Sequence, residues 1–201
     1  MKKMFCFLVW LCAIPAVFSL AAAHEAHEHG AAKMNIAVDG AQVSISLESP
    51  LVNFLPFEHI PATWEQRKQV KDMSGRMHRA EELFRLSPAA ECRLREVSLE
   101  SEKLDAALLD PAIPLDPAKS ESGREQNMQE QSGEETKTGK EEHGDLDADF
   151  VFQCAKPEKL NSVDILLFTA WPGLEKIAVQ AITPKGQRAA RLTAKKHLVS
   201  W

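Results

Sequence analysis

The stretch KMNIAVDGAQVSISLE, residues 33–48, contains two alternating runs of apolar and polar residues joined by an Asp-Gly pair. A period of two turns every second side chain toward the same face, which is typical of a half-buried antiparallel strand. An Asp-Gly pair between two such runs predicts a tight turn, because both positions of that turn favour positive φ. We therefore expect a β-hairpin with its turn at Asp39-Gly40.

The rest of the chain predicts further strands and one helical segment. Thr63 is the expected N-cap of that segment, because apolar residues recur every three or four positions over residues 64–86, and Gly75 predicts a break within it. Residues 49–63 combine apolar residues with three prolines and predict an irregular segment that crosses the core. The remaining expected strands are residues 91–101 (with a bulge), 148–155, 163–168, 175–182 and 188–193, with Pro184 and Gly186 in the last turn.

These elements predict an α+β protein with an antiparallel sheet of about six strands and one helical segment. An acidic segment separates two of the expected strands. Residues 116–149 contain 11 acidic and four basic residues and almost no apolar ones, which is too little apolar surface to offset the entropy of ordering. We expect a single domain over residues 33–201 with a disordered acidic insertion at about residues 116–147.

The first 23 residues have the features of a secretory signal peptide. Two lysines precede an uncharged apolar run, which ends in three alanines at residues 21–23. We expect cleavage after Ala23, export to the periplasm and no membrane insertion of the mature chain. His24 is then the expected N-terminus, within a flexible His-rich segment over residues 24–32.

Removal of this leader leaves 22 basic and 29 acidic residues, a net charge of −7, and two cysteines. Such an acidic chain is not expected to bind nucleic acid, whose protein partners are basic. Two cysteines in an exported protein most simply form one disulfide, Cys92–Cys154, and the alternative is two buried free thiols. The disulfide would join the two strands that flank the acidic insertion.

Histidines cluster at the expected mature N-terminus, in HEAHEHG at residues 24–30. His24, His27 and His29 lie within six residues. Neutral imidazoles so close together can converge on one ion and suit Zn²⁺, Cu²⁺ and Ni²⁺ alike. His143 lies among acidic residues of the insertion and is a fourth candidate ligand. The alternative is that these side chains are solvated and bind nothing.

No catalytic motif is present, and we do not expect an enzyme. His24-Glu25-Ala26-His27 has two residues between its histidines, whereas the zinc-protease motif has three on a helix. The chain also has no G-x-S-x-G and no Gly-rich phosphate loop. His59 in PFEHIP is more typical of a partly buried structural histidine than of a ligand, and Trp171 in Trp-Pro-Gly is more typical of a packing turn.

The sequence resembles the ZrgA-like family of small periplasmic zinc-binding proteins. The resemblance extends over nearly the whole expected mature chain outside the acidic insertion. It rests on the order and spacing of the following pieces: HEAHEHG, MNIAVDGAQVSISLESP, NFLPFEHIP, Cys-Arg-Leu at 92–94, Phe-x-Cys at 152–154 and WPGLEKIAVQAITPKGQRAARLT.

The resemblance implies a periplasmic protein that binds zinc and assists its uptake, beside an ABC-type zinc importer or its solute-binding protein. It also implies that a His-rich acidic loop between the two cysteine-bearing strands is the metal-binding tract. This chain departs from that pattern, because residues 101–147 contain only one histidine, His143. The expected ligands are therefore His24, His27 and His29, with His143 assisting.

Mobile imidazoles would bind Zn²⁺ with modest affinity and release it by ligand exchange to a better-organised acceptor. Binding should weaken as the pH falls through the histidine range, because a protonated imidazole cannot ligate a metal. Two alternatives remain at this point. One is an envelope protein that docks on a membrane complex and has no metal role. The other is a copper- or nickel-binding protein, since the Irving–Williams order favours copper at almost any such site.

Overall fold

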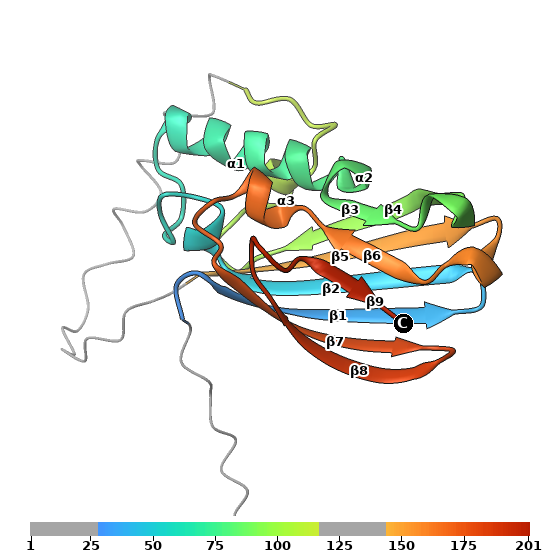
Figure 1. Ribbon diagram of the computed structural model, residues 1–201. Coiled ribbons are helices and arrows are strands. Elements are labelled where there is room, and N and C mark those ends of the chain that lie inside the picture. Colours follow the sequence, from blue (N-terminus) through green and yellow to red (C-terminus); the bar gives the residue numbers. More distant parts are fainter. Residues whose placement is uncertain (1–27, 117–143) are drawn as a thin grey trace, which may run out of the picture.

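The computed structural model describes residues 28–116 and 144–201. The predicted α+β class is confirmed: helices and a small sheet lie on one side of a six-stranded sheet (Figure 1). In the large sheet the strands lie in the order β4 (Cys92–Glu100), β5 (Asp145–Cys154), β2 (Gln42–Pro50), β1 (Ala31–Asp39), β7 (Lys176–Thr183) and β8 (Gly186–Leu192). The small sheet has the order β3 (Phe84–Leu86), β6 (Ser162–Ile165) and β9 (Leu198–Ser200).

The α-helices among the described residues are α1 (Trp64–Met77), α2 (Ala80–Leu83), α3 (Ala106–Leu109) and α5 (Leu167–Ala170). None of these helices has the length and apolar character needed to cross a membrane. Strand β3 lies in a segment where the sequence predicted a helix. Strand β9 lies where it predicted neither a helix nor a strand. Each has only three residues, too few for a period of two to be recognised.

The large sheet is antiparallel except between its strands β1 and β7, which run parallel. The sequence predicted an antiparallel sheet throughout, so this pairing corrects the prediction. Tight turns reveal the direction of strands that follow each other in the chain. β1 and β7 are far apart in the sequence, and no local signal gives their relative direction.

The predicted hairpin is present as β1 and β2, but its turn lies one residue later than expected. Asp39 pairs with Gln42, so the loop consists of Gly40 and Ala41. Gly40 has φ +55°, whereas Ala41 is not among the non-glycine residues with positive φ. Only the first loop position therefore needs the left-handed region, and glycine occupies it without steric cost.

Helix α1 begins where the sequence predicts. Thr63 is its N-cap and forms a capping box with Gln66, in which each side chain bonds the other residue's backbone N–H. The predicted break at Gly75 is wrong, because α1 continues through this residue to Met77. One glycine in a helix costs about 1 kcal/mol relative to alanine. The buried apolar side chains of α1 can offset such a cost.

The inner face of the large sheet, which we define as the face toward α1, forms the core. Its strands alternate between buried and more exposed residues, as the period of two predicts. Phe84 of β3 packs against Phe150 of β5 with ring centroids 4.8 Å apart. The irregular segment crosses this core as predicted, and Trp171 packs edge-on against its Phe54 at 5.2 Å. The side chains that this segment buries include Leu51, Asn53, Phe54, Leu55 and Phe57.

The disulfide Cys92–Cys154 is confirmed. The two cysteines face each other in the register of β4 and β5, with their Cα atoms 3.8 Å apart. The predicted bulge in β4 is also present, as a shift of register between Leu94 and Glu96. The disulfide therefore joins an edge strand of the large sheet to its neighbour.

Replacing both cysteines with alanine should lower the free energy of unfolding by about 4 kcal/mol. The disulfide closes a loop between two residues that are 62 positions apart, and without it the unfolded chain gains conformational entropy. Urea denaturation followed by circular dichroism measures this difference. Wild-type protein under reducing conditions should behave like the double variant. A loss of less than about 1 kcal/mol would contradict a structural role for the bond.

Strand β5 corrects the expected C-terminal limit of the acidic insertion. The sequence predicted disorder to residue 147, but β5 begins at Asp145. Asp145, Asp147 and Asp149 alternate with Leu146, Ala148 and Phe150, whose side chains are buried. These three acidic residues therefore belong to a strand. The acidic composition of the segment concealed the alternation of buried and exposed positions that marks the strand.

A row of carboxylates crosses three neighbouring strands on the outer face of the sheet, the face away from α1. Glu100 of β4 and Glu48 of β2 lie directly opposite Asp147 of the intervening β5. Burial raises the pKa of Asp147 above its usual value, and the charges of Glu48, Asp145, Asp149 and Glu100 raise it further. Like charges directly opposite each other destabilise a sheet.

The Asp147→Asn substitution should raise the free energy of unfolding at neutral pH by a few tenths of a kcal/mol, and by about 1 kcal/mol at most. Because the folded pKa of Asp147 is raised, its ionisation costs stability as the pH rises above the ordinary value of 3.8. The gain should therefore be full at pH 7 and disappear below about pH 4. Urea denaturation across this pH range measures it.

Asp149→Asn is the matched control, because the residues opposite Asp149 are Ser46 and Ser98 rather than carboxylates. It should stabilise the protein less than Asp147→Asn does. Equal gains from both substitutions would show that the row of carboxylates is not the cause.

Candidate metal site

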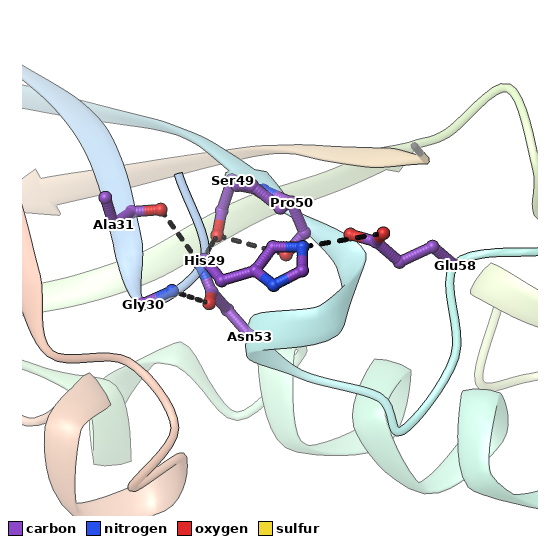
Figure 2. Close-up of polar contacts among 7 residues, drawn as sticks. All are labelled: His29, Gly30, Ala31, Ser49, Pro50, Asn53 and Glu58. Carbon is purple, nitrogen blue, oxygen red and sulfur yellow. Dashed lines mark hydrogen bonds and ion pairs between the residues drawn. The ribbon is translucent and has the colours of Figure 1, made fainter. Parts of the chain in front are cut away.

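His29 lies at one end of the large sheet, immediately before β1, and its ring faces a carboxylate. Its Nε2 atom lies 3.9 Å from Oε2 of Glu58 (Figure 2). The His29 side chain is 61% exposed, whereas that of Glu58 is only 16% exposed. An imidazole open to solvent thus approaches a carboxylate that the fold holds in place.

Asn53 fixes the backbone directly after His29. Its side-chain oxygen accepts a hydrogen bond of 2.7 Å from the backbone N–H of Gly30, and its amide donates to the carbonyl oxygen of Ala31 at 2.8 Å. The same amide donates to the hydroxyl of Ser49 at 2.9 Å. Asn53 is buried, and Figure 2 shows its side chain between these partners. These hydrogen bonds therefore fix the position at which the chain passes from His29 into β1.

Gly30 makes this path possible. Its φ of +78° lies in the region that favours glycine, and a Cβ atom would lie 3.0 Å from the side chain of Glu175. Its carbonyl oxygen accepts hydrogen bonds from the N–H groups of Glu175 and Lys176 at 2.7 and 2.9 Å. Lys176 also donates to Glu28, and this hydrogen bond lowers the pKa of the Glu28 carboxyl.

The end of the acidic insertion reaches the same place. Leu51 donates its backbone N–H to the carbonyl oxygen of Gly144 at 2.8 Å. A Cβ atom on Gly144 would lie 2.7 Å from the carbonyl oxygen of Glu58, so glycine is required for this approach. Gly144 directly follows His143 in the chain. The segments that carry the predicted ligands thus join the described fold beside Glu58.

Of the four predicted metal ligands, only His29 belongs to the described residues. His24, His27 and His143 lie outside them. Within the described residues, no group of three or more His, Cys, Asp or Glu side chains is arranged to hold a metal ion. The pair of His29 and Glu58 can supply two ligands of a metal site.

His59 makes structural contacts, as the sequence predicts, although it is exposed rather than partly buried. Its Nδ1 lies 2.9 Å from the carbonyl oxygen of Ile60 and its Nε2 lies 3.4 Å from the amide of Gln66. Its ring stacks on Phe57 with centroids 5.2 Å apart. These contacts link the loop of Glu58 to the N-terminal turn of α1.

The other two described histidines lie elsewhere. His78 ends α1, where its Nδ1 lies 3.0 Å from the carbonyl oxygen of Ser74. His197 precedes β9, and its Nδ1 contacts the carboxylate of Asp164 on β6. Neither histidine contributes to the pair of His29 and Glu58.

Sequence reasoning missed the two residues that organise this site, Glu58 and Asn53. Glu58 is adjacent to His59 in PFEHIP, and the prediction for this segment concerned only the histidine. Asn53 is a single amide in the apolar run LVNFLPF, and a polar residue in such a run indicates a buried hydrogen-bonding role.

The described residues therefore define a disulfide-linked α+β protein with an imidazole–carboxylate pair at one end of its sheet. A family model described as "ZrgA family zinc uptake protein" matches residues 26–201. The chain belongs to this family, which confirms the resemblance found in the sequence, and the family is one of zinc uptake proteins rather than of enzymes. A comparison with curated proteins found no match.

The Asn53→Ala substitution should lower the free energy of unfolding by about 2–4 kcal/mol, because it leaves a buried N–H and a buried carbonyl oxygen without their side-chain partner. Urea denaturation measures the loss. Gln42→Ala removes an exposed side-chain hydrogen bond of 3.2 Å to Ser44 and is the control, with an expected loss below about 0.5 kcal/mol. Equal effects would contradict the anchoring role of Asn53.

Proposed function

We propose that this protein is exported to the periplasm, where it captures Zn²⁺ and delivers it to a zinc uptake system. The acceptor would be an ABC-type zinc importer or its solute-binding protein. Membership of a family of zinc uptake proteins supports a role in zinc handling. The leader-like first 23 residues support export.

One observation carries the proposal of a binding site: the two segments with the predicted ligands join the fold beside the same residue, Glu58. His29 faces Glu58 at 3.9 Å, and Gly144, the residue after His143, contacts the backbone of Glu58. Two ligands of a tetrahedral zinc ion, each about 2.1 Å from the metal, lie roughly 3.4 Å apart. A small movement of the exposed His29 ring would bring the pair to that separation.

The remaining ligands would come from His24, His27 and His143. Consecutive Cα atoms lie about 3.8 Å apart, which places His143 beside Gly144 whatever its conformation. His24 precedes His29 by five residues, so their Cα atoms lie within about 18 Å of each other. Chain connectivity alone therefore keeps all three imidazoles close enough to reach an ion held by His29 and Glu58.

The chemistry of these residues suits capture and release better than permanent storage. Glu58 is held by the fold, whereas the His29 ring is mostly exposed and can exchange with an incoming ligand of the acceptor. Ordering each further imidazole costs conformational entropy, which limits the affinity. A carrier with modest affinity can transfer its ion to a better-organised site.

Zinc binding should depend on both described residues of the pair. We expect His29→Ala and Glu58→Gln each to weaken Zn²⁺ binding at least tenfold, because each removes one metal ligand and tenfold corresponds to only about 1.4 kcal/mol. Calorimetric titration of protein beginning at His24 measures this effect. A variant in which His24, His27 and His29 are all alanine should bind more weakly still.

His78→Ala is the matched control, because it also removes one imidazole but at the opposite end of α1 from Glu58. It should bind Zn²⁺ as the wild type does. Wild-type affinity in the Glu58→Gln and His29→Ala variants would place the ligands elsewhere. No binding by the wild type would favour the docking protein without a metal role, and tighter binding of Cu²⁺ or Ni²⁺ in competition would change the proposed ion.

A further inference from the structure

The outer face of the large sheet carries neither residue of the pair of His29 and Glu58. The buried alternate residues of its strands face the core, so the residues between them face away from it. Figure 1 shows α1 on the core side of the sheet. Among the described residues, no helix or strand covers this outer face. The side chains on its central strands are small or polar, which allows a second flat surface to approach closely.

The charges on this face are divided between its two halves. One row of the register runs straight across all six strands in the order Glu100, Asp147, Glu48, Lys33, Ala178 and Arg191. The half formed by β4, β5 and β2 therefore carries three carboxylates, and the half formed by β1, β7 and β8 carries two bases. The boundary lies between β2 and β1, where Lys33 and Glu48 of one chain are 3.7 Å apart.

The neighbouring row at the C-terminal end of β2 has the same division, whereas at the hairpin end Arg93 lies on β4 and Asp39 on β1. Pro50 pairs with Asp145 on the acidic side, and Ala31 pairs with Lys176 on the basic side. Toward the hairpin turn, apolar residues occupy both halves: Val151 lies on β5 and Ile182 on β7. Ile182 is 58% exposed, which is high for a large apolar side chain.

We propose that the outer face binds the outer face of a second copy of this chain, related to the first by a twofold axis that runs along the strands between β1 and β2. Such a rotation keeps the strand direction and reverses the order of the strands. β4 of one copy then lies over β8 of the other, β5 lies over β7, and β2 lies over β1.

This rotation brings opposite charges together. Glu100 of one copy approaches Arg191 of the other, Glu48 approaches Lys33, and Asp145 approaches Lys176. In the next row Asp149 approaches Gln180, and in the row beyond it Val151 approaches Ile182. On β2 and β1 the residues of these two rows are small or uncharged. Each pair occurs twice in the dimer because of the symmetry. The face is thus complementary in charge to the same face of a second copy, and no other partner is needed to explain this arrangement of charges.

The size of the face agrees with that of a stable interface. Six strands about 4.8 Å apart and seven to ten residues long cover roughly 700–900 Å². Standard interfaces bury about 800 Å² on each partner and are about as polar as the rest of the surface. Aligned sheets pack with side chains in contact at a spacing of about 10 Å.

Contact with the basic half of a second copy would also offset the electrostatic repulsion within the acidic half of a single chain. The directly opposed carboxylates of Glu48, Asp147 and Glu100 repel one another across β2, β5 and β4. Positive charges above this row would offset the repulsion. The association should therefore be strongest at low ionic strength, where exposed charges are least screened.

Charge reversal at opposite edges of the sheet tests the proposal. Glu100 is on β4 and Arg191 is on β8, about 24 Å apart across five strand spacings, so they cannot form a pair within one chain. We expect Arg191→Glu and Glu100→Arg each to weaken the dimer at least tenfold. The double variant Glu100→Arg with Arg191→Glu should recover an affinity within about threefold of the wild type, because it restores the pair between copies.

Sedimentation velocity of protein beginning at His24, at low salt and with a chelator present, measures the association without bridging metal. The wild type should sediment with twice the mass of one chain. Lys68→Glu, which makes the same charge change as Arg191→Glu on the exposed surface of α1, should leave the dimer intact.

Three results would overturn the proposal. A wild type that stays monomeric up to about 100 μM would show that this face does not bind a second copy, since weaker association has no role at ordinary concentrations. A dimer that tolerates both single reversals would use another surface. A double variant as weak as the single ones would exclude the proposed orientation. None of these results bears on zinc binding, which calorimetric titration measures separately.

Discussion

The register between β1 and β2 is the constraint on which the rest of the structure depends. A shift by one residue would turn Met34 and Ile36 toward solvent and bring Lys33 into the core. The same register places Glu48 and Lys33 side by side on the outer face and fixes where β2 ends. Because the turn of Leu51–Asn53 follows β2 directly, the position of Asn53 against Gly30 also depends on it. The core, the charged face and the candidate metal site thus share one cause.

The candidate site lies where the chain enters two strands of the large sheet, rather than within a helix or a strand. Asn53 and Gly30 set the direction in which the chain enters β1, and Gly144 sets the point at which it enters β5. Both points lie near Glu58, a residue of an irregular loop whose own position is supported by the contacts of His59 with α1. The described part of the protein supplies a carboxylate and two defined points at which the chain enters the sheet.

Much of the fold could be predicted from the sequence because its signals are local. Alternation revealed β1, β2 and β4, Thr63 before a helical period revealed the start of α1, and two cysteines in an expected exported chain indicated the disulfide. The parallel pairing of β1 with β7 could not be predicted, since it joins strands distant in the sequence. The approach of Glu58 to His29 was missed for the same reason: it is a tertiary contact across 29 positions. The family followed from ordered motifs rather than from any single residue.

The disulfide has a consequence for the segment between residues 117 and 143. Cys92 precedes this segment and Cys154 follows it, so the bond connects the two parts of the chain independently of the peptide backbone between them. A protease that cuts anywhere inside the segment leaves one covalent molecule with the same set of strands. The length and composition of the segment can likewise change during evolution without altering the register of β4 and β5. Histidines and acidic residues can therefore be gained or lost in this segment while the sheet stays the same.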